Sequence, residues 1–109
     1  MPVVNLTPHA VTVAGHTFAP SGSVARCTEE SVSAGTWEGI PFARVSYGYP
    51  EGLPPETSGT LYIVSAMVRS AVPTRRDLAS PGRLVRDEAG NVVGCECLIV
   101  NGVAGPVNP

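Results

Sequence analysis

Lysine is absent from this chain of 109 residues, and all seven of its basic residues are arginines. Arginine presents a planar fork of donors that suits carboxylate and phosphate groups, although the codons of a GC-rich genome produce the same bias. Nine acidic residues give a formal net charge of −2. This balance argues against non-specific binding to nucleic-acid polymers, which requires a positive surface.

Long apolar runs are also missing, since none approaches the roughly 18 residues that a membrane span needs. The start, Met1-Pro2-Val3-Val4-Asn5, has no basic segment followed by an apolar stretch. We therefore expect no secretory signal and no membrane partner, and a protein that stays in the cytoplasm.

Cysteine is scarce, and the three residues Cys27, Cys95 and Cys97 form an odd set that indicates free thiols. Cys95 and Cys97 lie two apart in an expected strand, so both thiols should point to one face. Together with Cys27 and a histidine they could bind zinc. A second closely spaced pair, which structural zinc sites usually have, is missing. We therefore favour buried thiols and predict neither a metal nor a cofactor.

Proline and glycine are abundant, at eleven and twelve residues, and they divide the chain into short segments. This pattern predicts one α+β domain over residues 1–109, with a mostly antiparallel β-sheet or partly closed barrel, one short helix and a loose tail at about 102–109. Ser65 should cap the helix, Pro73 should end it, and a loop should follow over 74–83. The expected strands are 3–6, 10–13, 16–19, 24–28, 31–36, 40–47, 61–64, 84–86 and 92–100, and the expected helix is 66–72.

The densest polar cluster is Thr74-Arg75-Arg76-Asp77. Arg75 and Asp77 can form a charge-assisted pair that leaves donors free for an anion. They can equally form a surface ion pair in a solvated loop, worth ~0–1 kcal/mol. Both interpretations stay open at this point.

Three other residues can serve a pocket. His9 follows Thr7-Pro8 at a strand break, where an imidazole can act as a base if a partner fixes its tautomer. Ser65 lies between a strand and a helix but lacks the glycines of a nucleophile elbow, which favours a cap. Tyr47 lies beside a stiff Pro- and Gly-rich loop and can stack on a flat ring.

Several segments together resemble a family of small uncharacterised domains found in bacteria and their phages. The matching motifs include Asn5-Leu6-Thr7-Pro8-His9, Tyr62-Ile63-Val64-Ser65, Arg75-x-Asp77-Leu78 and Arg86-Asp87-x-x-Gly90. By context alone, such a domain is similar in type to the compact phage proteins that sequester nucleotide signals of host immunity. The resemblance implies a shared ligand-contacting role for Asn5, Thr7, His9, Arg75 and Asp77.

These observations lead us to expect a non-enzymatic module that binds a small, nucleotide-like anion as a homo-oligomer in the cytoplasm of a bacterial host. Arg75 would neutralise phosphate charge, Asn5 and Thr7 would form hydrogen bonds, and Tyr47 would stack on a base. One alternative is a small hydrolase or nucleotide-processing enzyme that uses His9 with Asp77 or Ser65. Another is a structural or interaction protein whose strand edges pair with a partner. Product formation separates the first alternative from simple binding.

Overall fold

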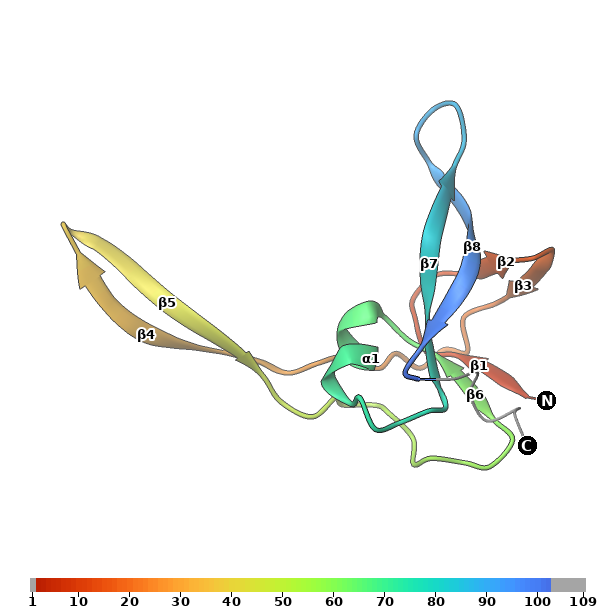
Figure 1. Ribbon diagram of the computed structural model, residues 1–109, viewed down its shortest axis with the longest axis horizontal. Helices are drawn as coiled ribbons and strands as arrows, with labels where there is room; N and C mark the ends of the chain where they lie inside the picture. The colour runs from red at the N-terminus through yellow and green to blue at the C-terminus, as the bar shows by residue number, and fades with distance from the viewer. Residues whose placement is uncertain (1, 103–109) are drawn as a thin grey trace.

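The computed structural model describes residues 2–102, and it confirms a small α+β protein that consists mostly of strands with one short helix (Figure 1). The elements in chain order are β1 (Val3–Asn5), β2 (Val11–Val13), β3 (His16–Phe18), β4 (Glu29–Trp37), β5 (Ile40–Tyr47), β6 (Leu61–Ile63), α1 (Ala66–Ala71), β7 (Leu78–Arg86) and β8 (Val92–Val100).

Six strands form the main sheet in the order β1-β6-β7-β8-β2-β3. A bridge between Asn5 and Pro20 links the end of β1 to the residues after β3, so the sheet is nearly closed into a barrel. Most of the paired positions are antiparallel, as expected. However, β1 pairs with β6, β6 with β7, and β2 with β8 in parallel register. Strands adjacent in the sequence form antiparallel hairpins at β2–β3, β4–β5 and β7–β8.

The β4–β5 hairpin stands apart as a second, two-stranded sheet, which we call the arm. It projects away from the rest of the molecule, and every one of its strand residues is exposed (Figure 1). The radius of gyration is 16.6 Å, against about 13 Å for a compact chain of 100 residues. The arm thus makes the molecule elongated.

Two tight turns explain the β2–β3 and β4–β5 hairpins. Ala14 and Gly15 have φ of 50° and 79°, and Glu38 and Gly39 have φ of 51° and 79°. Positive φ at both central residues is the turn geometry that matches the twist of a two-residue hairpin. The strands expected on either side of each turn, at 10–13 and 16–19 and at 31–36 and 40–47, are confirmed with small shifts of their ends.

The core lies on both faces of β6, as the continuous apolar run at its position predicts. Tyr62 and Val64 face one cluster with Leu6, Val68 and Leu78. On the opposite face, Ile63 packs with Val11 and Cys95.

Helix α1 begins and ends close to the predicted positions. The Ser65 side chain accepts a hydrogen bond from the Val68 backbone N–H at 3.2 Å, which confirms the cap. Val68 and Val72 are buried against the sheet, whereas Met67 is exposed, so the helix buries a narrow apolar stripe.

Two expectations about individual segments are wrong. Residues 24–28 form no strand. Their backbone hydrogen bonds go to different segments, from Ala25 to Leu6, between Arg26 and Glu51, and from Gly48 to Thr28, so no continuous ladder forms. The loop expected over 74–83 ends early, since β7 begins at Leu78. The sequence hides this start because Pro81 and Gly82 interrupt the strand pattern.

Most of the expected loose tail, residues 103–109, lies outside the described residues. No helix within residues 2–102 is long and apolar enough to span a membrane.

Substitution of Gly52 tests the close approach of two loop segments. Gly52 has φ of +78°, and a Cβ atom there would lie 2.6 Å from the backbone oxygen of Val24. We expect Gly52→Ala to lower the free energy of unfolding by more than about 2 kcal/mol, because strain and a backbone clash add. Urea denaturation measures this loss.

Gly59→Ala is the matched control, since Gly59 has φ of +79° and open space around it. It should cost only about 1 kcal/mol, the strain of positive φ alone. Equal losses in the two variants would show that the approach to Val24 does not matter.

Candidate functional site

The loop after β1 is organised by the side chain of Asn5, which is buried. Its Nδ2 donates to the backbone oxygens of His9 and Phe18, at 2.8 and 2.9 Å. Its Oδ1 accepts from the backbone N–H and the hydroxyl of Thr7, at 3.0 and 2.6 Å. The side chains of Asn5 and Thr7 and the backbone of His9 are therefore brought together. Both donors and both acceptor positions of the amide are committed to the protein.

A hollow of about 290 Å³ opens beside this loop, and we call it the Arg26 hollow. Ala25 N donates to Leu6 O at 3.0 Å, which brings the segment before the arm against the loop that follows β1. The residues that line the hollow are Leu6, Thr7, Pro8, Val24, Ala25, Arg26, Cys27, Ser65 and Met67.

The Arg26 hollow offers hydrogen-bond donors above apolar walls. Arg26 is exposed, and its guanidinium carries five N–H donors. The Ser65 oxygen accepts from Val68 N–H, so its hydroxyl proton remains available for another acceptor. The single hydroxyl proton of Thr7 is directed to Asn5 Oδ1 or to the backbone oxygen of His9, at 2.6 and 2.9 Å, so the donors open to a ligand are those of Arg26 and Ser65. An anion with an apolar portion fits this combination.

A second hollow of about 250 Å³, which we call the apolar hollow, lies between β2 and the β7–β8 hairpin. It shares Thr7 and Ser65 with the Arg26 hollow, and His9 also faces it. Most of its lining is apolar, and the full set is Thr7, His9, Ala10, Val11, Thr12, Ser65, Pro81, Leu84, Val92, Gly94 and Cys95.

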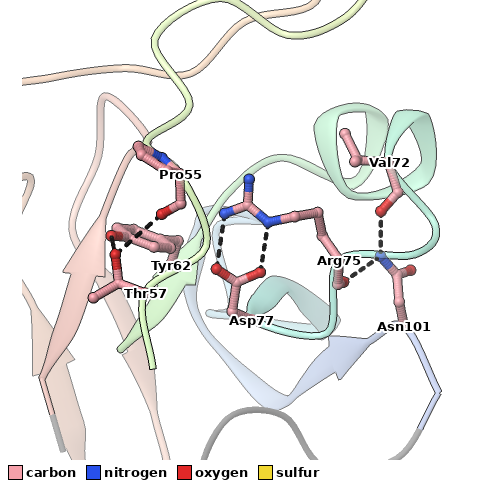
Figure 2. Close-up of polar contacts among 7 residues, drawn as sticks. All are labelled: Pro55, Thr57, Tyr62, Val72, Arg75, Asp77 and Asn101. Carbon is pink, nitrogen blue, oxygen red and sulfur yellow. Dashed lines mark hydrogen bonds and ion pairs between the residues drawn. The ribbon is translucent and has the colours of Figure 1, made fainter. Parts of the chain in front are cut away.

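Arg75 and Asp77 form a buried, two-pronged ion pair (Figure 2). Arg75 Nε donates to Asp77 Oδ1 and Nη2 donates to Oδ2, both at 2.8 Å. Arg75 is 8% exposed and Asp77 is 1% exposed. The hydrogen bond to Asp77 raises the pKa of Arg75 above its ordinary value, although burial acts in the opposite direction. The pair is thus a structural contact rather than a solvated loop pair.

The pair lies away from the loop after β1. Asp77 lines a different hollow of about 390 Å³, with residues Glu56, Thr57, Ser58 and Gly59. In that region Tyr62 Oη donates to the Thr57 hydroxyl at 3.2 Å, and Thr57 donates to Pro55 O at 3.1 Å (Figure 2). Three of the five donors of Arg75 remain beyond the two bonds to Asp77.

Tyr47 occupies a third location, at the base of the arm. It lines a hollow of about 340 Å³ with Met67, Ser70 and Ala71 of α1. The six expected ligand-contacting residues therefore fall in three places: Asn5, Thr7 and His9 in one, Arg75 and Asp77 in another, and Tyr47 by itself.

The sequence analysis did not identify several polar residues that shape the Arg26 hollow and the end of α1. Arg26 lacked a motif, and its place beside Thr7 depends on backbone pairing between distant segments. Asn101 Nδ2 lies 3.1, 3.2 and 3.1 Å from the backbone oxygens of Arg69, Val72 and Arg75, and so caps the end of α1. Arg69 in turn donates from Nε to the buried Ser80 hydroxyl at 2.8 Å.

The three cysteines are free thiols in different environments. Cys27 packs against the core cluster around Leu6, whereas Cys95 belongs to the cluster around Ile63. Across residues 2–102 no group of three or more His, Cys, Asp or Glu side chains is placed to hold a metal ion.

Removing one member of the buried ion pair should destabilise the protein strongly. Arg75→Ala leaves the Asp77 carboxylate buried without its partner, which we expect to cost about 3–5 kcal/mol in the free energy of unfolding. Replacing both residues, as in Arg75→Leu with Asp77→Leu, should cost less than Arg75→Ala, because no charge is then left unpaired. Urea unfolding of each variant provides the comparison.

The neighbouring Arg76 is exposed, so Arg76→Ala serves as the control and should change stability by less than about 0.5 kcal/mol. Similar stabilities of Arg75→Ala and Arg76→Ala would argue against a structural role for the pair.

Comparisons with protein-family models, with curated proteins and with solved structures found no match for this chain. The resemblance to small bacterial and phage domains therefore stays a prediction.

Proposed function

We propose that this protein is a non-enzymatic module that binds a small anionic molecule in the Arg26 hollow. The observation that supports this most directly is that an exposed arginine, Arg26, lines the same hollow as Ser65, whose hydroxyl proton is available. Charge-assisted hydrogen bonds from arginine are among the stronger contacts to phosphate or carboxylate. Leu6, Val24 and Met67 supply apolar wall for the uncharged part of the ligand.

In this proposal Arg26 takes the charge-neutralising role that the sequence suggested for Arg75. The Arg75 fork already holds Asp77 through two bonds, and its side chain is almost fully buried. Asn5 acts indirectly, because it fixes the loop that presents Thr7.

A nucleotide-type ligand is the chemical class that we propose. The hollow of about 290 Å³ is near the lower limit for small-molecule sites, which suits a compact ligand with one charged end. The resemblance to phage domains supports a role in sequestering a nucleotide immune signal in the cytoplasm of a bacterial host, as a homo-oligomer.

The geometry favours binding over catalysis. An enzyme would need His9 aligned with Ser65 or Asp77. The Ser65 oxygen is engaged as the helix cap, and both carboxylate oxygens of Asp77 are held by Arg75. His9 and Asp77 also line different hollows.

Isothermal titration calorimetry with a panel of linear and cyclic nucleotides tests the proposal. We expect one class of nucleotide to bind and Arg26→Ala to weaken its affinity by about tenfold to a hundredfold, the loss expected for a hydrogen bond to a charged group. Arg26→Lys should also weaken binding, because a point charge does not reproduce the planar fork.

Arg83→Ala is the matched control, since Arg83 is an exposed arginine of β7 that lines none of the four hollows described here. If Arg26→Ala and Arg83→Ala bind the nucleotide equally well, the hollow is the wrong site. Conversion of the nucleotide to a product would favour the enzyme alternative. Absence of binding to every nucleotide would favour an interaction protein.

A further inference from the structure

The arm carries large apolar side chains along one of its faces. Ile40 and Phe42 lie two apart on β5, and Ile40 is the cross-strand partner of Trp37. Arg44 follows on the same face, opposite Val32. Trp37 is 68% exposed at the tip, and Val32, Ile40 and Phe42 are also exposed. The outer part of the arm therefore presents a continuous apolar face to solvent.

An isolated two-stranded hairpin is marginally stable in water and normally requires a packing partner. The arm is fixed where it leaves the body, because Gly48 N–H donates to Thr28 O at 2.8 Å and the Arg26–Glu51 bridge closes the two connecting segments. It points away from α1 and the main sheet (Figure 1). Its own chain therefore leaves the apolar face uncovered.

The same chain has a second uncovered apolar surface at the apolar hollow. Leu84 and Val92 line this hollow from the β7–β8 hairpin, and both are about half exposed. This hairpin and the arm extend in different directions, so the tip of the arm does not reach the hollow within one molecule (Figure 1).

We propose that two copies of this chain form a dimer by reciprocal exchange of arms, with the Trp37 tip of each copy seated on the apolar hollow of the other. A twofold dimer closes this contact, because each copy supplies one arm and one hollow. A buried tryptophan in a pocket is a common anchor of protein interfaces. One kind of partner thus covers both uncovered surfaces.

The exposed area of the arm and the charges beside the apolar hollow fit a second copy of this chain. Aromatic side chains carry roughly 150–250 Å² each, so Trp37 and Phe42, which are 68% and 46% exposed, present on the order of 200 Å². The other arm residues and the hollow bring each copy toward the roughly 800 Å² that a typical interface buries per partner. Glu38 at the tip would meet Arg86, the cross-strand neighbour of Val92 at the lip of the hollow. The inference does not depend on the proposed ligand.

Sedimentation equilibrium of the full chain tests the dimer, and the single tryptophan of the chain supplies a second readout. We expect the wild type to be dimeric and its Trp37 emission to shift to longer wavelength on dilution, as the indole becomes solvated. Trp37→Ser and Val92→Asp should each weaken the dimer at least tenfold, and both should keep the circular dichroism spectrum of the wild type.

Val93→Asp is the control, because Val93 is 53% exposed beside Val92 at 51% but does not line the hollow. This variant should dimerise as the wild type does. A monomeric wild type, an assembly larger than a dimer, or equal effects of Val92→Asp and Val93→Asp would overturn the proposal. If Val92→Asp unfolds, Trp37→Ser decides, since Trp37 lies outside the core.

Discussion

The buried ion pair of Arg75 and Asp77 is the contact on which the central sheet depends. Because each charge would be costly in the interior without the other, the pair fixes the path of the chain between α1 and β7. The backbone oxygen of Asp77 then accepts from Tyr62 N at 2.8 Å, which sets β7 beside β6 in parallel register. The short connection between α1 and β7 is therefore held in place by the ion pair of Arg75 and Asp77.

Other loops are held by hydrogen bonds from a buried or partly buried side chain to the backbone. Asn5 joins the turn after β1 to the end of β3, and Asn101 ties the end of α1 to the residues after β8. Within the described part of the chain, no buried side-chain nitrogen or oxygen lacks a partner. The buried polar groups therefore serve the architecture, whereas exposed groups such as Arg26 present their donors to solvent.

Local features were predictable from the sequence because their causes are local. The glycine turns at Gly15 and Gly39, the Ser65 cap and the buried strand around Ile63 each follow from a few adjacent residues. The grouping of Asn5, Thr7 and His9 follows for the same reason. The parallel pairings were not predictable, nor was the place of Arg26, because they join segments far apart in the chain. Arg75 and Asp77 were identified as partners, but only the tertiary structure shows that they are buried.

The pairing of strands near the N-terminus with later strands affects how the chain can fold while it is being synthesised. β1 pairs along its length with β6, and Val13 of β2 pairs with Cys95 of β8. Contacts between distant segments are slow to form because the long intervening loop must first be closed. A growing chain emerging from the ribosome therefore carries β1 without its strand partner until β6 has been made, and the β2–β3 hairpin without β8 until almost the whole sequence has been made. During that interval the nascent chain depends on its surroundings, rather than on its own sheet, to remain free of aggregation.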